Sequence, residues 1–334
     1  MQPKPIKAAI TAVGGYVPED VLNNADLEKM VDTSNDWIVS RTGIHERRIL
    51  KEEGIGTSFM AIKAIDDLKQ KVADWNPETI DLIIFATITP DMPLSATAAY
   101  VASQIGATQA FGYDLTAACS GFLYGLSTAA AFIGSGRYKK VLVIGADKMS
   151  SIVDYEDRTT CVLFGDGAGA VLMEASTNGY GWEDEILRMN GEQRMALTIK
   201  AGGSMQPITS EALKNKDNYL QQEGRTVYKM AVSGMCQVTL DILANNQLSS
   251  DDLAYVVPHQ ANLRIIEGLQ DRLGVAEQKV LKNIQYYGNT TAATLPLVLN
   301  DYHHKFKAGD KIILTAFGGG FTWGAAYLTW AYST

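Results

Sequence analysis

The sequence is poor in the residues that build disulfide frameworks and metal centres, with only three cysteines and four histidines among 334 residues. A small, odd number of cysteines in a chain of this length is typical of a reducing compartment. No apolar run approaches the length of a membrane span, and the apolar stretch 8–13 is interrupted by Gly14 and Gly15, unlike a secretory signal. A net charge of −8 leaves no basic excess of the kind that nucleic-acid-binding proteins carry. We therefore expect a soluble, cytoplasmic protein with no metal, no nucleic-acid partner and no membrane insertion.

What the sequence does contain is an alternation of short β-branched runs with longer helical patterns. The strand candidates are 6–13, 82–88, 111–115, 140–145, 168–174, 255–258, 311–317 and 325–331, and the helical candidates are 57–74, 96–105, 121–134, 225–245, 263–273 and 291–303. Several strand candidates are apolar without alternation, as strands covered on both faces are. The alternation predicts an α/β fold with mostly parallel sheets.

Three matches at nearly one offset indicate an internal duplication. Segment 81–86 resembles 252–257 (252 − 81 = 171), the loop and helix from Cys119 resemble those from Asn289 (289 − 119 = 170), and 140–145 resembles 311–316 (311 − 140 = 171). They predict two similar halves, residues 1–175 and 176–334. Equivalent loops of such halves would meet at a pseudo-twofold axis, where a cleft is expected.

Cys119 is the first candidate for chemistry, because it follows a strand candidate and opens a helical pattern. Unpaired N–H groups and the helix dipole at such a position favour the thiolate, the reactive form of cysteine. An isolated cysteine among small residues is also a common core residue, and context alone leaves these two interpretations about even. Cys161 and Cys236 lack such a context and are expected in the core.

His259 directly follows a buried strand candidate, and open α/β sheets bind their ligands at the carboxyl ends of strands. A packing role for this histidine remains equally possible at this stage. His45, His303 and His304 lie in polar segments and are expected at the surface. Asn289 precedes a helical candidate, where asparagine often serves only as a cap, but the repeat would bring it toward Cys119.

Glycine-rich segments complete the candidates. Segment 317–324 carries three consecutive glycines after a strand candidate, which allows backbone N–H groups to approach a ligand closely. One such N–H could stabilise an oxyanion, whereas the spacing does not fit a phosphate-binding loop. Segment 165–169 has the wrong glycine spacing for a dinucleotide site, and we interpret it as a tight turn.

With Cys119, His259 and Asn289 in this order, the sequence resembles the β-ketoacyl-acyl carrier protein synthase III family of the thiolase superfamily over essentially its whole length. The resemblance rests on segments 35–44, 117–122, 164–169, 258–266, 288–290 and 317–324. It implies an α/β fold of two duplicated halves that form a thiolase-like five-layered α-β-α-β-α sandwich, in agreement with the repeat. Thiolases carry a second catalytic cysteine where this chain has Ala316 and Phe317, and elongating ketosynthases carry a second histidine in place of Asn289.

The resemblance also implies a mechanism. Cys119 would take an acyl group from an acyl-CoA, and malonyl-acyl carrier protein would then lose CO₂ and attack that group. His259 Nε2 and the Asn289 amide would donate hydrogen bonds to the thioester oxygen as charge develops on it. The backbone N–H groups of Cys119 and Gly319 would hold the oxygen of the acyl group.

Substrate-binding residues follow from the same resemblance. The adenine of CoA would lie between Trp37 and Arg158, with Arg41 near the phosphates and Asn262 along the pantetheine tunnel. Because CoA is then a substrate, no resident cofactor is expected. The carrier protein would dock on residues 260–264, namely Gln260, Ala261, Asn262, Leu263 and Arg264. Family members are homodimers, and the strand at 111–115 would cross the interface.

Two departures from the family concern the acyl pocket. Met92 and Leu94 occupy a region where many relatives place a Phe that lines the pocket of the neighbouring subunit. Tyr228 stands where a Phe commonly flanks the tunnel. Since methionine adapts easily to larger ligands, branched or medium-chain acyl groups are expected to compete with acetyl.

Two other functions remain open. One is a thiolase-fold acyltransferase, or a ketosynthase-like enzyme of specialised metabolism, which would use the same cysteine to pass acyl groups to other acceptors. A non-catalytic acyl-CoA-binding protein would need no reactive Cys119. A papain-like hydrolase is disfavoured because its characteristic surroundings of the cysteine are missing.

Overall fold

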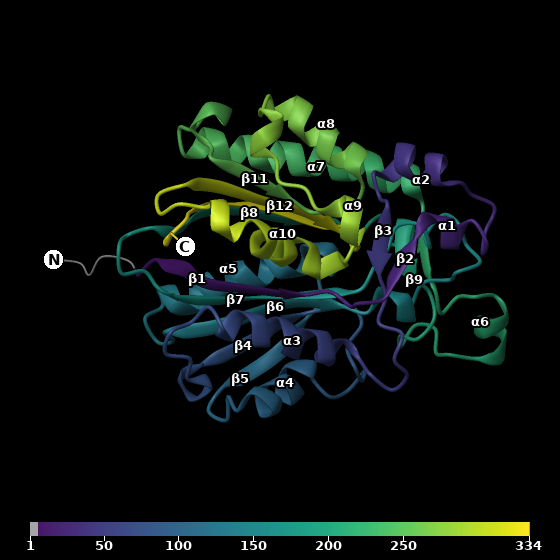
Figure 1. Cartoon of the computed structure of the whole chain (residues 1–334), viewed down its shortest axis with the longest axis horizontal. Helices are drawn as coiled ribbons and strands as arrows, with labels where there is room; N and C mark the ends of the chain where they lie inside the picture. Colours follow the sequence, from purple (N-terminus) through teal and green to yellow (C-terminus); the bar gives the residue numbers. More distant parts are fainter. Residues whose placement is uncertain (1–5, 334) are drawn as a thin grey trace.

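Two β-sheets form the framework of the structure, a computed structural model that describes residues 6–333 (Figure 1). The first has the strand order β1 (Ala8–Tyr16), β7 (Gly167–Ala175), β6 (Lys140–Asp147), β4 (Leu82–Ala86) and β5 (Phe111–Leu115). The second has the order β11 (Tyr255–Pro258), β12 (Lys311–Gly318), β13 (Thr322–Thr329) and β8 (Gly181–Met189). The predicted strands are therefore present, and β8 is an edge strand that the apolar pattern did not indicate.

The two sheets repeat one topology. In the first sheet the pairs β1/β7 and β7/β6 are antiparallel and the pair β6/β4 is parallel. In the second sheet the pairs β8/β13 and β13/β12 are antiparallel and the pair β12/β11 is parallel. This repetition confirms the duplicated fold. The prediction of mostly parallel sheets is wrong, because two of the three pairs shared by the halves are antiparallel. The division between 1–175 and 176–334 stays a prediction.

Helices complete five layers. Helices α3 (Thr57–Lys69) and α4 (Thr97–Ile105) cover the outer face of the first sheet, and α7 (Gly224–Asn245) covers the second, with α8 (Leu263–Leu273) packed on α7. Helices α5 (Gly121–Gly134) and α10 (Thr294–Tyr302) lie between the sheets and contact both (Figure 1). A helix sandwiched between two sheets must be apolar on most sides, and α5 buries Phe122, Leu123, Leu126, Ala129 and Ile133. The predicted five-layered sandwich is confirmed.

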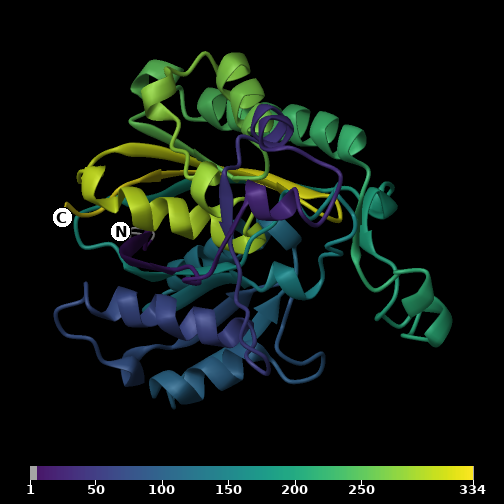
Figure 2. The ribbon, with the colours of Figure 1, turned by 45° about the vertical axis from the view of Figure 1, so that its right-hand side comes forward.

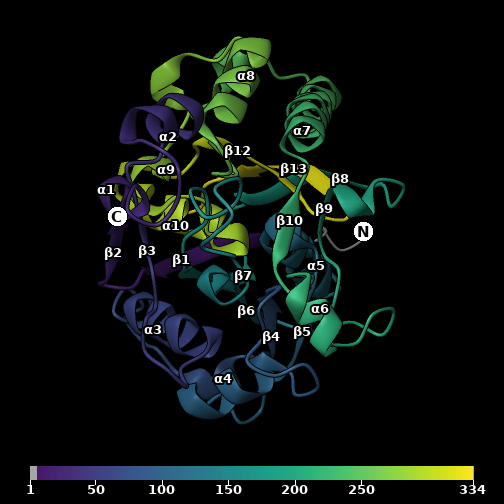
Figure 3. The same cartoon turned by 90° about the vertical axis from the view of Figure 1, so that its right-hand side faces the viewer.

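Short elements surround one end of the sandwich. They are β2 (Val21–Asn23), α1 (Asn24–Leu27), α2 (Asn35–Thr42), β3 (Glu46–Arg48), β9 (Leu197–Ile199), α6 (Ser210–Lys214), β10 (Leu220–Gln222) and α9 (Ile284–Tyr287). Figure 2 shows the segment that contains α6 projecting from this end, and Figure 3 shows α6 next to the paired strands β9 and β10. None of these elements is apparent in the sequence, because each is too short to establish a hydrophobic period. Within residues 6–333, the helices include none that combines the length and the apolar character needed to cross a bilayer.

Candidate active site

Two 3₁₀ turns, one from each half, meet between the sheets. Ala118–Ser120 carries Cys119 and leads into α5, while Thr291–Ala293 leads into α10, and the two turns contact each other. Each begins at a residue in the left-handed region, Ala118 with φ 47° and Thr291 with φ 53°. The structural offset at this loop is therefore 173 residues (291 − 118), so the counterpart of Cys119 is Ala292. The predicted equivalence of Cys119 with Asn289 is wrong by three residues, although both loops do reach the same place.

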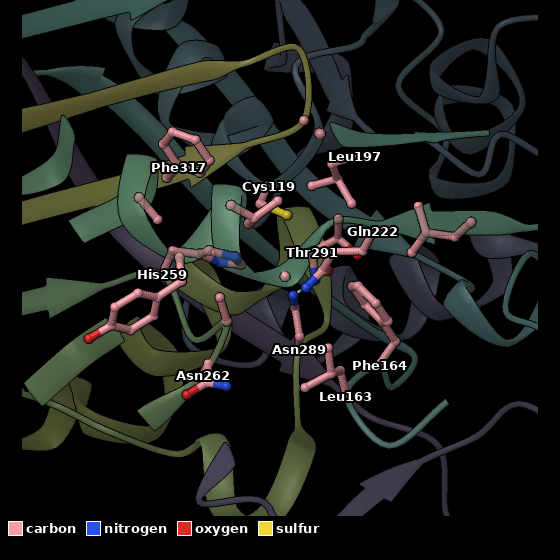
Figure 4. A pocket seen from close by; sticks show the side chains of 18 of the residues that line it. Cys119, Leu163, Phe164, Leu197, Gln222, His259, Asn262, Asn289, Thr291 and Phe317 are labelled. Atoms are coloured by element: carbon pink, nitrogen blue, oxygen red, sulfur yellow. Dashed lines mark hydrogen bonds between the residues drawn. The ribbon is translucent and has the colours of Figure 1, made fainter. Parts of the chain in front are cut away.

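A cavity of about 1020 Å³ opens beside these turns. Its walls include all four predicted catalytic residues, Cys119, His259, Asn289 and Gly319. Figure 4 shows the side chains of the first three directed into one space, although they come from loops far apart in the sequence. The cavity thus joins a nucleophile, a histidine and an amide in one site.

Cys119 lies just before the N-terminus of α5, as predicted, and is only 5% exposed. Burial, and then the negative charge of Asp147, raise the pKa of the Cys119 thiol well above its usual value. Desolvation thus opposes the thiolate that the helix terminus favours, and the activated thiolate stays a prediction.

The glycine-rich end of β12 packs directly on the cysteine turn. A Cβ atom on Gly318 would lie 2.7 Å from the backbone nitrogen of Cys119 and 2.9 Å from that of Ser120, closer than real Cβ atoms come. Only glycine fits this approach. The next residue, Gly319, lines the cavity beside Cys119. The role of these two backbone N–H groups as oxyanion donors stays a prediction.

His259 follows β11 and is buried. Its backbone N–H donates to Thr315 at 2.8 Å, which fixes it to the end of the sheet, and its Nδ1 lies 2.7 Å from the hydroxyl of Thr294. Burial lowers the pKa of the imidazole to about 3. The ring is therefore neutral at physiological pH and carries one proton on one of its two nitrogens.

Asn289 is held on both its backbone and its side chain. Its N–H donates to the carbonyl of Leu163 at 2.9 Å, and its carbonyl accepts from Gly165 at 3.1 Å. Its side-chain Oδ1 accepts the backbone N–H of Thr291 at 2.9 Å. With the amide oxygen occupied in this way, the NH₂ group is the end of the side chain that remains for a ligand.

Asp147 is a buried carboxylate beneath the site that the sequence analysis missed. Its Oδ1 accepts hydrogen bonds from the hydroxyls and backbone N–H groups of the loop after β4, contributed by Thr87, Ile88 and Thr89. Its Oδ2 accepts the N–H of Ala292 at 3.1 Å. Burial raises the pKa of Asp147 to about 6. The residue joins the first half to the turn that follows Asn289.

Three of the four predicted CoA-binding residues line this cavity, and the fourth, Arg158, lies beside one of them. Trp37, Arg41 and Asn262 line it. The Arg158 guanidinium lies 5.7 Å from the centre of the Trp37 ring, and its Nη1 donates to the carbonyl of Asp32 at 2.7 Å. Trp37 and Arg158 come from separate segments, and the fold brings them together as the family resemblance implies. Their contact with an adenine stays a prediction.

The predicted docking segment is only partly at the surface. Arg264 is exposed, with its guanidinium 5.7 Å from the centre of the Tyr228 ring, and Asn262 caps α8 through the N–H of Arg264. Ala261 and Leu263 are half-buried. Gln260 is fully buried and donates to the carbonyls of Pro258 and Leu281. Including Gln260 in a docking surface was therefore wrong.

Of the three predicted acyl-pocket residues, Tyr228 lines the cavity. Met92 and Leu94 lie outside it and are 62% and 96% exposed, so a contact with a bound acyl group would require a second copy of the chain. The apolar wall of the cavity comes instead from residues that sequence analysis did not single out: Ile88, Met149, Val162, Leu163, Phe164, Leu197, Ile199 and Leu220.

The remaining cysteines and histidines stay away from this site. Cys161 and Cys236 are buried in the core as predicted, and His45, His303 and His304 lie outside the cavity. Within residues 6–333, no group of three or more His, Cys, Asp or Glu side chains is placed to hold a metal ion.

Comparisons with known proteins agree with this geometry. The family model of 3-oxoacyl-[acyl-carrier-protein (ACP)] synthase III matches residues 113–191, and the model of its C-terminal part matches residues 243–330. A β-ketoacyl-[acyl-carrier-protein] synthase III of Phocaeicola vulgatus is 53% identical over 327 residues, which cover 98% of each chain.

Solved structures give the same result. The 3-oxoacyl-[acyl-carrier-protein] synthase III of Aquifex aeolicus has a TM-score of 0.88 at 43% identity, covering 97% of this chain and 100% of its own. The priming β-ketosynthase of the R1128 polyketide pathway has a TM-score of 0.90 at 29% identity, covering 100% of this chain and 99% of its own.

Proposed function

Because the chain belongs to the β-ketoacyl-[acyl-carrier-protein] synthase III family, we propose that it is the initiating condensing enzyme of fatty acid synthesis. It joins the acyl group of acetyl-CoA, or of another short or branched acyl-CoA, to malonyl-acyl carrier protein. The products are β-ketoacyl-acyl carrier protein, CoA and CO₂. The convergence of Cys119, His259 and Asn289 on one cavity carries this proposal.

In the first step Cys119 Sγ attacks the thioester carbon of the acyl-CoA. The bond from that carbon to the CoA sulfur breaks, and the thiol proton of Cys119 ends on the released CoA. The backbone N–H groups of Cys119 and Gly319 hold the oxygen of the acyl group during the attack. Because the thiol is buried and its pKa is raised, the proton must leave as the new bond forms.

In the second step malonyl-acyl carrier protein replaces CoA in the cavity. The bond between its α-carbon and carboxylate breaks, CO₂ leaves, and the electron pair moves into the thioester as an enolate. The Nε2–H of His259 and the NH₂ of Asn289 donate hydrogen bonds to the enolate oxygen. The α-carbon then attacks the acyl group, and Cys119 leaves as a thiolate that regains a proton.

The surroundings of the cavity support the proposed handling of both substrates. Trp37 and the neighbouring Arg158 offer an indole face and a guanidinium plane to the adenine, and Arg41 offers a guanidinium group to the phosphates. The exposed Arg264 lies at the same cavity, where an acidic carrier protein would dock. CoA is here a substrate, and the proposal needs no resident cofactor.

The assembly and location of the protein are also part of the proposal. Strand β5 forms an edge of the first sheet, and its first two residues, Phe111 and Gly112, are exposed. Such an edge can pair with the same strand of a second copy, which supports a homodimer. The three cysteines are all free, as is usual in a reducing compartment, which supports a location in the cytoplasm.

Intact-mass measurement tests the function directly. Acetyl-CoA should add one acetyl group, Cys119→Ala should abolish the addition, and malonyl-acyl carrier protein should then remove the group and yield a β-ketoacyl product with CO₂. Modification of Cys161 or Cys236 in place of Cys119 would contradict the assignment of the nucleophile. No acylation of the wild-type protein would favour a non-catalytic acyl-CoA-binding protein.

A second function, priming in specialised metabolism, is favoured by the likeness to the R1128 polyketide ketosynthase. The fold and the three side chains suit both pathways. The choice depends on the carrier protein, so condensation rates with carriers of fatty acid and polyketide pathways distinguish the two. An acyltransferase would instead pass the acyl group on without releasing CO₂.

A further inference from the structure

Thr291 lines the active-site cavity, and its buried hydroxyl oxygen has no hydrogen-bond partner. The residue is only 2% exposed, it lines the cavity, and its Oγ1 has no hydrogen-bond partner. Among residues 6–333, several buried polar side-chain atoms lack a partner, and Thr291 Oγ1 is the one whose residue lines the active-site cavity. Because a buried hydroxyl without a partner is costly, this atom needs an explanation.

The backbone of Thr291 is strained as well. It has φ 53°, in the left-handed region that β-branched residues rarely adopt. Its N–H donates to Asn289 Oδ1 and its carbonyl accepts the N–H of Thr294, so both backbone groups are occupied. Only the side-chain hydroxyl is free.

The residue equivalent to Thr291 in the other half shows that the left-handed backbone and the hydroxyl are independent features. Ala118 begins the equivalent turn with φ 47° and has no hydroxyl. The turn therefore requires the left-handed backbone but not the hydroxyl, which is present only where the turn follows Asn289. A threonine at this position, with its strain and its unpaired oxygen, is not explained by the fold.

One polar group of the proposed substrates still lacks a protein partner. The thioester oxygen of the malonyl group is assigned to His259 and Asn289, and the oxygen of the acyl group to two backbone N–H groups. The malonyl carboxylate has no assigned donor. Thr291 lies two residues after Asn289, on the same wall of the cavity (Figure 4).

We propose that Thr291 Oγ1 donates a hydrogen bond to the malonyl carboxylate and thereby orients the bond that breaks when CO₂ leaves. The bond between the α-carbon and the carboxylate must be perpendicular to the plane of the thioester, so that its electron pair can enter the enolate. A neutral hydroxyl suits this task, because a paired cation would stabilise the carboxylate in the ground state and oppose its loss. The inference rests on the proposed function and deepens it.

The test compares Thr291→Val, which keeps the branched shape and removes the hydroxyl, with Thr291→Ser, which keeps the hydroxyl. Thr291→Val should lower kcat/KM for malonyl-acyl carrier protein by about tenfold or more, the effect of one lost hydrogen bond to a charged group. Acetyl loading on Cys119 should change less than about twofold, because an acetyl group has no carboxylate. Thr291→Ser should retain most of the condensation rate.

Binding provides a second readout that needs no turnover and that also serves if Thr291→Val folds poorly. In a Cys119→Ala background, Thr291→Ala should weaken the binding of malonyl-CoA and leave the binding of acetyl-CoA unchanged, while Thr291→Ser should bind both as the parent does. Equal weakening for both ligands, or a condensation rate of Thr291→Val equal to the wild type, would overturn the proposal. If the wild-type protein itself does not condense, the proposed function fails, which is a different result.

Discussion

The Nδ1 atom of His259 lies 2.7 Å from the hydroxyl oxygen of Thr294. The ring is neutral, because burial lowers its pKa to about 3, so this contact decides which nitrogen carries the proton. The hydroxyl also lies 3.2 Å from the carbonyl of Thr291, a longer contact that it can give up because that carbonyl accepts the N–H of Thr294. If the hydroxyl donates to Nδ1, the proton of the ring stays on Nε2, as the proposed donor role requires.

Replacing Thr294 should therefore weaken decarboxylation and spare loading. Thr294→Val removes the group that holds the Nε2–H form, and we expect condensation to fall by roughly five- to tenfold, the worth of about one hydrogen bond. Thr294→Ser should restore it. Steady-state rates with malonyl-acyl carrier protein measure the effect, and the ¹⁵N spectrum of His259 reports the tautomer. A wild-type ring protonated on Nδ1 would contradict this assignment.

His259 should also make the fold sensitive to acid. Its folded pKa of about 3 lies below the ordinary value of 6.5, so between these values the unfolded chain binds more protons than the folded one. The stability from this group is fully present above pH 6.5 and is lost as pH falls toward 3. His259→Gln should lose less stability than the wild type over this interval in denaturant titrations. Parallel curves for the two proteins would show that His259 is not the cause.

Asp147 should control both the reactivity of Cys119 and the turn at Ala292. In Asp147→Asn the negative charge that raises the pKa of the Cys119 thiol is gone, so alkylation of Cys119 at neutral pH should become faster. Condensation should become slower, because the new NH₂ group would face the Ala292 N–H that Oδ2 now accepts.

Asp166→Asn provides the matched control for this change. Asp166 is also a buried carboxyl, but it accepts from Ser150 and Leu50 and does not act on the pKa of Cys119. It should leave the alkylation rate nearly unchanged. The same acceleration in both variants would indicate loosening of the fold and not a charge effect.

Arg264 should matter for the carrier protein and not for CoA. Arg264→Glu replaces attraction to an acidic partner with repulsion, so the KM for malonyl-acyl carrier protein should rise several-fold and the wild-type KM should rise with salt. Lys63→Glu makes the same charge change at an exposed position of α3, on the opposite outer layer (Figure 1), and should have little effect. An equal rise in the KM for acyl-CoA would assign Arg264 to the tunnel.

The sequence was sufficient for the parts of the molecule that depend on regular periods. Strand β5, the cysteine turn and helix α5 were predicted in place, because a short strand pattern, small residues and a helical period follow one another there. Strand β8 was missed because Glu183, Asp184 and Glu185 make it appear polar. It is an edge strand, half-buried against β13, so its charges remain near water.

The contacts that shape the site were not accessible from the sequence. Asp147 is 145 residues from Ala292, whose N–H it accepts, and no local pattern reports such a pair. Gln260 follows His259, which points into the cavity, and Gln260 was predicted at the surface. Its side chain is buried instead, because it donates hydrogen bonds to the carbonyls of Pro258 and Leu281. The left-handed backbone of Thr291 likewise depends on the packing of the two turns, and not on its own preference.

The burial of Cys119 has a consequence for the timing of the reaction. A thioester on a sulfur that is only 5% exposed meets little bulk water, so hydrolysis competes poorly with transfer. The acylated protein can then wait with its group stored until a carrier arrives, and CoA can leave before the second substrate enters. The same cavity therefore binds the two substrates one after the other. The two half-reactions are linked by the lifetime of the acyl-enzyme and not by simultaneous binding of both substrates.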